Sequence, residues 1–318
     1  MARILLWHVH GSWTTAFVQG GHEYVLPVDE DRGPDGRGRA RTWDWPRSVV
    51  ERTREELPGI EPDLVVLQRP HEAELVRQWT GRRPGVDLPA VYLEHNTPGG
   101  EIPYTRHPMA DQDRIPVVHV THVNRLLWDT GSARTTVIEH GICDPGHRYT
   151  GEVPHAAVAM NDPVRRGRAV GVDLLPLLAT AAPVDVFGMR TEGVADPALH
   201  ITAYDDLPQD RMHDELARRR LYVHTARWTS LGLSLIEAMQ LGLPVVALAM
   251  TEVPTAVPPG TGLVTADLDV LVRHVEALVK DPELAADLGH RGRVHALDRF
   301  GLERFLSDWD DVLERALR

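Results

Sequence analysis

Short apolar segments alternate with amphipathic segments along this chain, and the alternation begins a second time after about residue 150. Runs of four to eight mostly apolar residues are typical of buried strands, whereas apolar residues spaced three and four apart are typical of helices. Strands separated by helices of roughly ten residues need crossover connections, which produce parallel sheets. The sequence therefore predicts an α/β protein built from two consecutive doubly wound, Rossmann-like domains.

The expected elements follow from this pattern. In the first half, strands are expected at 4–9, 21–28, 62–68, 89–96, 115–122 and 135–141, and helices at 14–19, 46–57, 71–81 and 123–130. In the second half, strands are expected at 156–160, 184–187, 199–202, 221–224, 244–248 and 262–265, with final helices at 267–279, 282–297 and 302–317. Residues 29–41 are charged and glycine-rich, which predicts a mobile loop.

Charge and composition argue against several classes of protein. The net charge is −12 over 318 residues, and neither half has the basic excess of a nucleic-acid binder. Cys143 is the only cysteine, which excludes an intramolecular disulfide and fits a reducing cytoplasm. No segment has the length of a membrane span, and the N-terminus lacks the flanks of a signal peptide, so a soluble, cytoplasmic protein is expected. Peripheral membrane contact stays open, although no Lys/Arg-rich helix argues for it.

The segment WTSLGLSLIEAMQLGLPVVAL, residues 228–248, predicts a turn, a helix, a tight corner and a strand. Gly232 lies near the start of the helix, Gly242 ends it, and Pro244 opens the strand. A helix N-terminus offers unpaired N–H groups and a partial positive charge, which favour an anion such as a phosphate. Glu237 lies about one turn further in, where a carboxylate could reach a ligand hydroxyl. The alternative is an ordinary α/β unit with a solvent-facing glutamate.

Polar or glycine residues follow several predicted strands. In a parallel sheet these positions lie at one edge, where ligands bind, and a cleft between the two domains is the natural site. In the first half they include Gly11, Ser12, Trp13, His95 and Asn96. In the second half they include Asn161, Arg165, Arg166, Arg168 and Gly188.

The 17 histidines raise the question of a metal site. His8 and His10 are expected on one face of a strand, and His119 and His122 are three residues apart. No acidic or cysteine partners stand at ligand spacing near these pairs, so no metal site is expected.

The segment LGLSLIEAMQLGLPVVAL resembles the signature of the retaining GT-B glycosyltransferases of the glycosyltransferase 4 family. VIEHGICD at 137–144 is similar to the segment that ends the first domain in that family. Arg166-Gly167 stands where the family commonly has Lys-Gly, and DPELAADLGHRGRVHAL resembles its penultimate helix. The resemblance covers most of residues 137–300; over residues 1–136 it rests on strand order and on His95.

This resemblance implies a GT-B fold, in which two Rossmann-like domains face a central cleft. Residues 1–150 would form the acceptor domain, residues 151–299 the nucleotide-sugar donor domain, and residues 300–318 a C-terminal helix that docks back on the first domain. The partners would be a nucleotide-sugar donor and a hydroxyl-bearing acceptor, with no further cofactor and no essential metal. Retention in this family is explained by same-face attack within an ion pair, so no protein nucleophile is implied.

The resemblance also implies residue roles. Glu237 would bind the ribose hydroxyls, and Arg166, helped by Arg165 or Arg168, would bind the diphosphate. The amides around Gly232 and Leu233 would complete this anion site, and His95 would lie near the donor sugar. The remaining donor-side candidates are Asn161, Gly188, Thr229 and Ser230. The candidates of the acceptor side or cleft loops are Gly11, Ser12, Trp13 and Asn96.

One position departs from the family pattern. The family has a second glutamate before the one matched by Glu237, with seven residues between the two, and this chain has Thr229 at that position. A hydroxyl carries no negative charge, so sugar recognition is expected to differ. A nucleotide-sugar 2-epimerase of the same fold and a non-catalytic nucleotide-sugar binder are the alternatives. The sequence does not fix the nucleotide base, the sugar, the acceptor or the oligomeric state.

Overall fold

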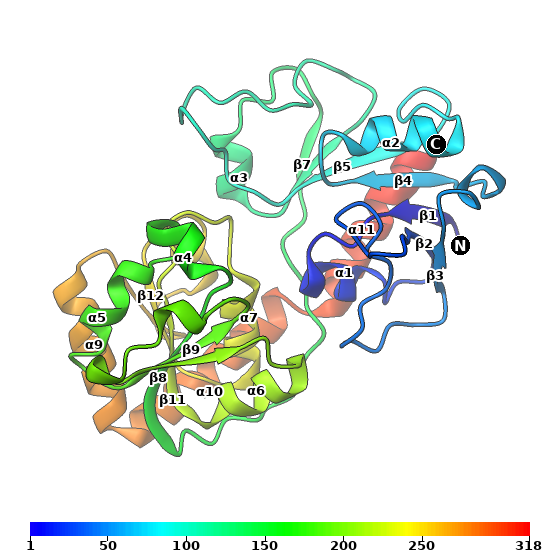
Figure 1. The fold of residues 1–318 in the computed structure, drawn as a ribbon. Coiled ribbons are helices and arrows are strands. Elements are labelled where there is room, and N and C mark those ends of the chain that lie inside the picture. The colour runs from blue at the N-terminus through cyan, green and yellow to red at the C-terminus, as the bar shows by residue number, and fades with distance from the viewer. The chain divides into compact units, whose positions relative to one another are not determined.

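Two parallel β-sheets organise the chain in the computed structural model, which describes residues 1–318 (Figure 1). Unit 1 comprises residues 1–143 and 302–318, and unit 2 comprises residues 144–301. The sheet of unit 1 has seven strands and that of unit 2 has six, each flanked by helices. The predicted fold class, two doubly wound α/β units, is confirmed.

The sheet of unit 1 has the strand order β3-β2-β1-β4-β5-β6-β7, with every neighbouring pair parallel. Its strands are β1 (Arg3–Leu6), β2 (Glu23–Pro27), β3 (Val49–Arg52), β4 (Leu64–Leu67), β5 (Ala90–Glu94), β6 (Val117–His119) and β7 (Thr135–Val137). Its helices are α1 (Gly11–Phe17), the 3₁₀ turn η1 (Leu57–Gly59), α2 (Glu72–Thr80), α3 (His122–Leu127) and the C-terminal α11 (Leu302–Leu317).

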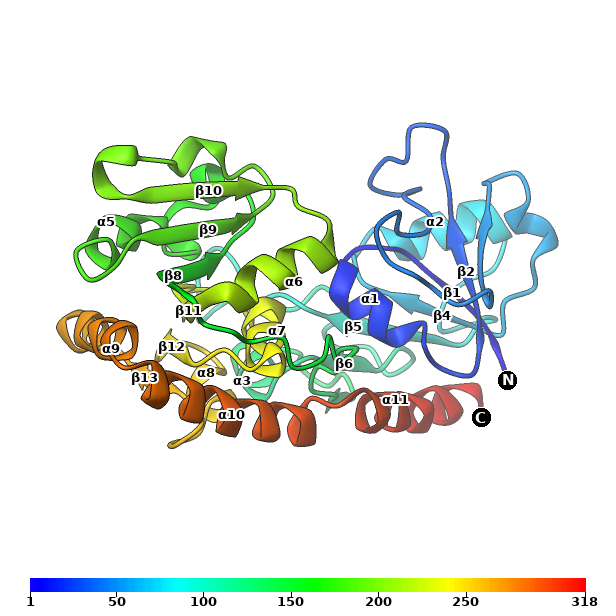
Figure 2. The ribbon, with the colours of Figure 1, turned by 90° about the horizontal axis from the view of Figure 1, so that it is seen from below.

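Helix α11 lies beside α1 in unit 1 (Figure 2). Its apolar stripe places Phe305 and Trp309 in the core, and the ring of Trp309 lies 5.6 Å from that of Trp13 and 5.0 Å from that of Phe17. Aromatic rings packed edge to face at this spacing bury large areas with favourable geometry. The last helix is therefore part of the core of unit 1, although 158 residues of unit 2 precede it in the sequence.

The sheet of unit 2 has the order β10-β9-β8-β11-β12-β13 and is also fully parallel. Its strands are β8 (Val153–Ala159), β9 (Val184–Gly188), β10 (Ile201–Asp205), β11 (Arg219–His224), β12 (Val245–Leu248) and β13 (Leu263–Thr265). Its α-helices are α4 (Pro163–Arg166), α5 (Leu175–Leu178), α6 (Gln209–Arg218), α7 (Leu233–Leu241), α8 (Val253–Ala256), α9 (Leu268–Lys280) and α10 (Pro282–Arg299). Single 3₁₀ turns are η2 (Gly167–Ala169), η3 (Val172–Leu174), η4 (Glu192–Val194) and η5 (Pro197–Leu199).

The predicted helix at 46–57 is wrong. Val49 and Val50 begin strand β3, where they pair with Tyr24 and Val25 of β2. Two adjacent β-branched residues favour this edge strand over a helix. The strand is tied to the 29–41 loop by Glu51, which accepts from the Arg32 guanidinium at 2.8 Å.

Three other boundaries differ from the prediction. Helix α1 begins at Gly11, so residues 11–13 are helical and do not form a loop. Strand β1 ends at Leu6, so His8 and His10 lie beyond it and share no strand face. The units divide between Cys143 and Asp144, seven residues before the expected boundary at 150.

No helix is both long enough and apolar enough to span a bilayer.

Each sheet has one position where the chain reverses its direction of winding. In unit 1 this position lies between β1 and β4, and in unit 2 between β8 and β11. Open parallel sheets bind ligands beyond the carboxyl ends of the strands at such a switch point. The loops that leave β8 and β11 in unit 2, and β1, β4 and β5 in unit 1, are therefore the places to look for a site.

Candidate functional site

The N-terminus of α7 in unit 2 carries no side-chain cap. Its N-cap residue is Gly232, which has no side chain that could accept a hydrogen bond from the first amides of the helix. Gly232, Leu233 and Ser234 are partly exposed, whereas every residue from Leu235 to Leu241 is buried. The amides of the first turn and the partial positive charge of the helix end thus meet solvent at one place, which suits an anion.

Glu237 lies one turn inside α7 and is only 5% exposed. This placement contradicts the alternative of a solvent-facing glutamate. His213, from helix α6, is a neighbour of this carboxylate: its Nε2 lies 3.7 Å from Oε2 of Glu237. The side chain of Gln209 contacts the same imidazole nitrogen at 2.8 Å. A carboxylate is expensive to bury, so polar groups must surround Glu237 here.

Gly232 is required by a close approach. A Cβ at this position would lie 2.5 Å from Cε1 of His224, the last residue of β11. His224 is 4% exposed, and its Nε2 has no hydrogen-bond partner. Burial lowers the pKa of His224 to about 4, so the imidazole is neutral at pH 7. The ring that packs against the start of α7 is consequently uncharged.

Tyr222 supports the same turn from below. Its hydroxyl lies 3.0 Å from Oγ of Ser234 and 3.4 Å from Nδ1 of His224. Burial raises the pKa of the Tyr222 phenol well above its usual value. The three polar side chains therefore form one uncharged group that holds the first turn of α7 against strand β11.

The loop after β8 is bonded to the loop after β11. The amides of Arg227 and Trp228 donate to the carbonyl of Ala169 at 2.9 and 3.1 Å, and the hydroxyl of Thr225 donates to the carbonyl of Val170 at 2.7 Å. These loops leave adjacent strands at the switch point of unit 2. The arginine-rich segment after Met160 is thus held next to the segment that leads into α7.

The three arginines of this segment have different partners. Arg165 pairs with Asp162, and Arg168 pairs with Asp173 at 2.7 Å. Arg166 has no carboxylate within ion-pair distance. Desolvation and the charge of Arg165 lower the pKa of Arg166 from its usual value, although a guanidinium stays charged at any working pH. Arg166 is therefore the cation of this loop that an incoming anion would pair with.

The other donor-side candidates are distributed around the same loops. Asn161 accepts from the amide of Met189 at 2.9 Å, so its side chain holds the loop after β9. Gly188 has φ +144°, and a Cβ there would lie 2.2 Å from the carbonyl oxygen of Met160. Thr229 is partly buried and Ser230 is 5% exposed. Asn161 and Gly188 thus have clear structural roles beside any contact with a ligand.

Unit 1 gathers three histidines from three loops. His10 follows β1, His95 follows β5 and His140 follows β7. The ring centroids of His10 and His95 are 3.9 Å apart, and those of His95 and His140 are 6.3 Å apart in a stacked arrangement. Burial lowers the pKa of His10 to about 4, that of His140 to about 3 and that of His95 well below its usual value. The cluster is neutral at pH 7, which lets the rings pack closely.

Gln68 fixes the tautomer of His95. The Gln68 amide nitrogen donates to the carbonyl of Trp7 at 2.7 Å, so its oxygen faces Nε2 of His95 at 3.2 Å. An amide oxygen only accepts, so Nε2 of His95 must carry the proton. The neutral ring then presents Nδ1 as its acceptor.

His140 is tied to the last helix. Arg304 of α11 donates to the carbonyls of Glu139 and His140 at 3.1 and 2.6 Å. Nδ1 of His140 is buried and has no hydrogen-bond partner. The segment at 137–140, predicted to end the first domain, is thus anchored within unit 1 by a residue from the opposite end of the sequence.

The remaining site candidates of unit 1 differ in how deeply they are buried. Gly11 and Ser12 are partly exposed in the first turn of α1, and Asn96 is exposed after β5. Trp13 is fully buried, with its ring 5.2 Å from that of His95. Trp13 therefore supports His95 from the core and does not form part of a loop surface.

Five polar residues of these groups are not among the candidate site residues expected from the sequence. They are His10, Gln68, His140, His213 and His224. A signal existed for three of them, because His10, His140 and His224 each end or follow a predicted strand. No group of three His, Cys, Asp or Glu side chains is arranged to hold a metal ion.

Comparison with known proteins gives a partial match in sequence. The family profile of the glycosyl transferases group 1 matches residues 197–295, the part of unit 2 that contains α6 and α7. The N-acetyl-alpha-D-glucosaminyl L-malate synthase of Bacillus anthracis is 28% identical over 113 residues. These residues are 35% of this chain and only 30% of the Bacillus anthracis protein.

Solved structures match over the whole chain. The sucrose-phosphate synthase of Thermosynechococcus elongatus has a TM-score of 0.70 and 15% identity, with 99% of both chains covered. Anabaena HepE in complex with UDP-glucose has a TM-score of 0.68 and 14% identity, with 99% of this chain and 100% of that chain covered. The glycosyltransferase of Rickettsia africae has a TM-score of 0.70 and 12% identity, with 100% and 99% covered. The chain therefore has the GT-B fold, and its residues 197–295 match the glycosyl transferases group 1.

Proposed function

We propose that this chain is a retaining glycosyltransferase of the glycosyltransferase 4 type, which moves a sugar from a nucleoside-diphosphate donor to a hydroxyl acceptor. One arrangement in unit 2 carries the proposal. The glycine-capped N-terminus of α7, the buried Glu237 one turn inside it, and the loop of Arg166, which is hydrogen-bonded to the segment that leads into α7, belong to the switch point of the sheet. The matched family profile and the GT-B fold support this reading.

In this proposal, the diphosphate lies against the amides of Leu233 and Ser234, and Arg166 pairs with its oxygens. The carboxylate of Glu237 accepts hydrogen bonds from the ribose hydroxyls. When the bond between sugar and phosphate breaks, negative charge grows on the departing phosphate oxygen. Donors that are already in place stabilise this transition state more than the ground state, and that difference is what accelerates transfer.

The acceptor hydroxyl then attacks the sugar from the face that the phosphate leaves. The departing phosphate takes the proton of that hydroxyl, so the configuration is retained without a protein nucleophile. His95 contributes a neutral imidazole, held in one tautomer by Gln68, that hydrogen-bonds a sugar hydroxyl. A neutral ring suits this role because it orients a hydroxyl without adding a charge.

The donor is proposed as a nucleotide sugar because proteins of similar fold hold such ligands. Anabaena HepE is solved with UDP-glucose and with UDP and glucose, and the pneumococcal O-GlcNAc transferase GtfA with UDP and GlcNAc. Thr229 replaces the carboxylate that the resembled family places eight residues before Glu237. We therefore expect the sugar to be recognised differently from the family pattern, and the donor must be found by screening.

A donor screen tests the proposal. Purified protein is incubated with UDP-, GDP- and dTDP-sugars, with and without a panel of hydroxyl acceptors, and nucleotide release and the anomeric configuration of the product are measured. The proposal predicts release of one nucleoside diphosphate with a product of retained configuration. A new sugar epimer without transfer, or tight binding without any turnover in the complete panel, contradicts it. Activity should persist in EDTA, because Arg166 and the helix amides supply the positive charge that a metal would otherwise provide.

A further inference from the structure

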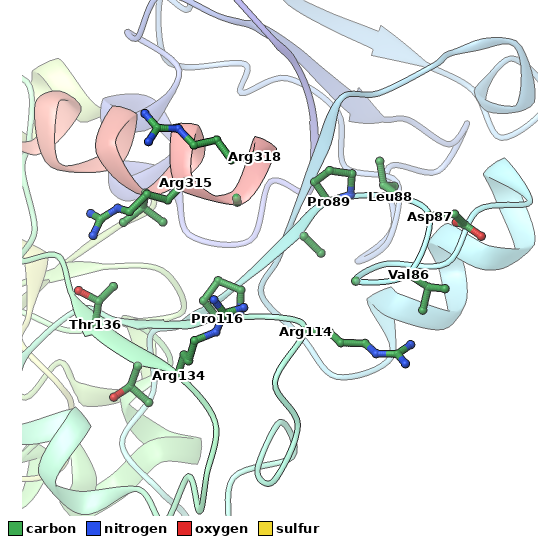
Figure 3. A pocket seen from close by; sticks show the side chains of 15 residues that line it. Val86, Asp87, Leu88, Pro89, Arg114, Pro116, Arg134, Thr136, Arg315 and Arg318 are labelled. Atoms are coloured by element: carbon green, nitrogen blue, oxygen red, sulfur yellow. The ribbon is translucent and has the colours of Figure 1, made fainter.

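A pocket of about 630 Å³ lies in unit 1, away from the histidine cluster (Figure 3). Its walls are the last turn of α11, the turn at 85–90 that leads into β5, and the residues that precede β6 and β7. Figure 3 shows Arg315 and Arg318 on the helix, Arg114 and Pro116 before β6, and Arg134 before β7. Segments from four parts of the sequence therefore surround one opening.

The pocket lies at the amino end of β5, whereas the candidate catalytic histidine, His95, lies at the carboxyl end of that strand. It includes Ala90, the first residue of β5, whereas His95 directly follows Glu94, the last residue of that strand. A strand of five residues spans about 16 Å. A ligand in this pocket would therefore be bound separately from the sugar-transfer site, and the inference does not depend on the proposed function.

Positive charge is concentrated around this pocket. Four arginines line it, Arg114, Arg134, Arg315 and Arg318, in a chain whose net charge is −12. The one lining carboxylate is Asp87, which already accepts from the backbone amide of Arg83 and from its guanidinium at 3.0 Å; these two contacts hold the Asp87 pKa below its usual range.

Three of the four lining arginines have no carboxylate partner. Arg134 and Arg315 donate only to backbone carbonyls, of Asp113 and Asp311, and Arg114 pairs with no carboxylate. Arg318 has one acidic neighbour, Glu314, at 3.7 Å. An anion in the pocket would give these arginines a charged partner.

The floor of the pocket is apolar. Leu88 and Val312 are 1% and 7% exposed, and Pro89, Pro116 and Ala316 complete the surface between them. Val86 stands at the rim and is 50% exposed. A simple inorganic ion would leave this apolar surface in water, whereas a ligand with an apolar body would cover it.

We propose that this pocket binds the phosphate group of an amphiphile. The phosphate lies among the guanidinium groups, and the apolar body packs on Leu88, Pro116 and Ala316. A phosphate offers several strong acceptor oxygens and up to two charges, which match arginines that come from different segments. Such a group exists both in soluble phosphate esters and in the headgroups of membrane lipids.

Calorimetric titration of the intact protein tests this site. The probes are dihexanoyl phosphatidic acid below its micelle concentration and inorganic phosphate. The expected result is that the amphiphile binds at least about tenfold more tightly than inorganic phosphate, and that R134A/R315A weakens its binding at least about tenfold. The matched control R77A/R125A removes two exposed arginines of unit 1 outside the pocket and should leave binding unchanged.

A second variant separates the pocket from charge alone. Ala316→Phe fills the apolar floor without changing any charge and should also abolish binding; thermal unfolding confirms that each variant is folded. Sedimentation with vesicles of phosphatidylglycerol and phosphatidylcholine identifies the source of the ligand. Binding to these vesicles that A316F removes assigns a lipid headgroup, and binding to the soluble probe alone assigns a soluble ester. No binding of the amphiphile, equal binding of inorganic phosphate, or equal loss in R77A/R125A overturns the proposal.

Discussion

Nε2 of His213 lies 3.7 Å from Oε2 of Glu237, with both side chains less than a tenth exposed. The distance is too long for a hydrogen bond, yet it is short enough for the imidazole to limit where the carboxylate can turn. His213 belongs to α6 and Glu237 to α7, so the contact joins two neighbouring helices of unit 2. Glu237 is accordingly the proposed ligand contact, and His213 is a residue that positions it.

Replacement of Glu237 should weaken donor binding strongly. Glu237→Ala removes the charged acceptor proposed for the ribose hydroxyls, and hydrogen bonds to a charged group contribute about 1.5–3 kcal/mol each. The donor KM should therefore rise about 10- to 100-fold, with Glu237→Gln intermediate. His213→Ala should raise the donor KM less than about tenfold and leave kcat nearly unchanged, because it acts only through Glu237. Glu276→Ala, on the exposed face of α9, is the control. Equal effects of Glu237→Ala and Glu276→Ala would contradict the assignment.

The three arginines after β8 should contribute unequally. Arg166→Ala should lower kcat/KM by an amount that corresponds to about 2–4 kcal/mol, because it removes a charge that is proposed to meet the diphosphate. Arg165→Ala and Arg168→Ala should have smaller effects, since Asp162 and Asp173 already engage these side chains. Steady-state kinetics of the three variants with one donor provide the comparison. A larger loss in either neighbour than in Arg166→Ala would show that the ion pairs open on binding and that the assignment is wrong.

A side chain at position 232 should displace the start of α7. Gly232→Ala puts a Cβ where His224 now packs, and overpacking of this kind costs about 1–3 kcal/mol. We expect a lower unfolding midpoint and donor binding weakened at least about tenfold. In a His224→Ala background the same substitution should cost much less, because the opposing ring is gone. If Gly232→Ala costs the same in both backgrounds, the contact with His224 is not its cause.

Acid should destabilise the fold through its buried neutral histidines. Burial holds the pKa of His119 at about 4 in the folded protein, below the usual value of 6.5. Between these values the unfolded chain binds more protons than the folded one, so stability is complete above pH 6.5 and falls as the pH drops toward 4. Similar shifts apply to His8, His10, His140 and His224.

His119→Leu isolates one such contribution. His119 is fully buried, neither ring nitrogen has a hydrogen-bond partner, and it has no place in the proposed transfer chemistry. The variant should be at least as stable as the natural chain at pH 7.5 and should lose less stability between pH 6.5 and pH 4, by up to about 1.4 kcal/mol per pH unit. Urea unfolding at four pH values measures this slope. If the free energy of unfolding falls equally with pH in the two proteins, the pKa of His119 is not lowered in the folded protein.

The start and the end of α7 could be predicted from the local sequence. Gly242 has φ +94° and ends the helix as predicted, and the helix begins at Leu233, directly after the predicted glycine. These features depend on backbone preferences that neighbouring residues set. The strand at 49–52 was missed because its stability comes from pairing with β2, about 25 residues earlier in the sequence.

The side-chain groups depend on contacts across the chain and were only partly predictable. His95 could be selected because it follows a strand, but its tautomer depends on Gln68, and Gln68 in turn on the carbonyl of Trp7. Likewise, the sequence showed three arginines after β8 without showing that two of them already have carboxylate partners. Whether a polar side chain still has a donor, acceptor or charge available for a ligand depends on its contacts in the folded chain.

The most direct test of the central claim compares nucleotides with and without their phosphates. Calorimetry should measure the affinities for UDP, GDP and dTDP and for the corresponding nucleosides, with the natural chain and with Arg166→Ala. If a diphosphate lies at the start of α7, one nucleoside diphosphate should bind at least about 100-fold more tightly than its nucleoside, and Arg166→Ala should remove at least about tenfold of that difference. Equal affinities for nucleotide and nucleoside, or a difference that Arg166→Ala leaves unchanged, would contradict the account.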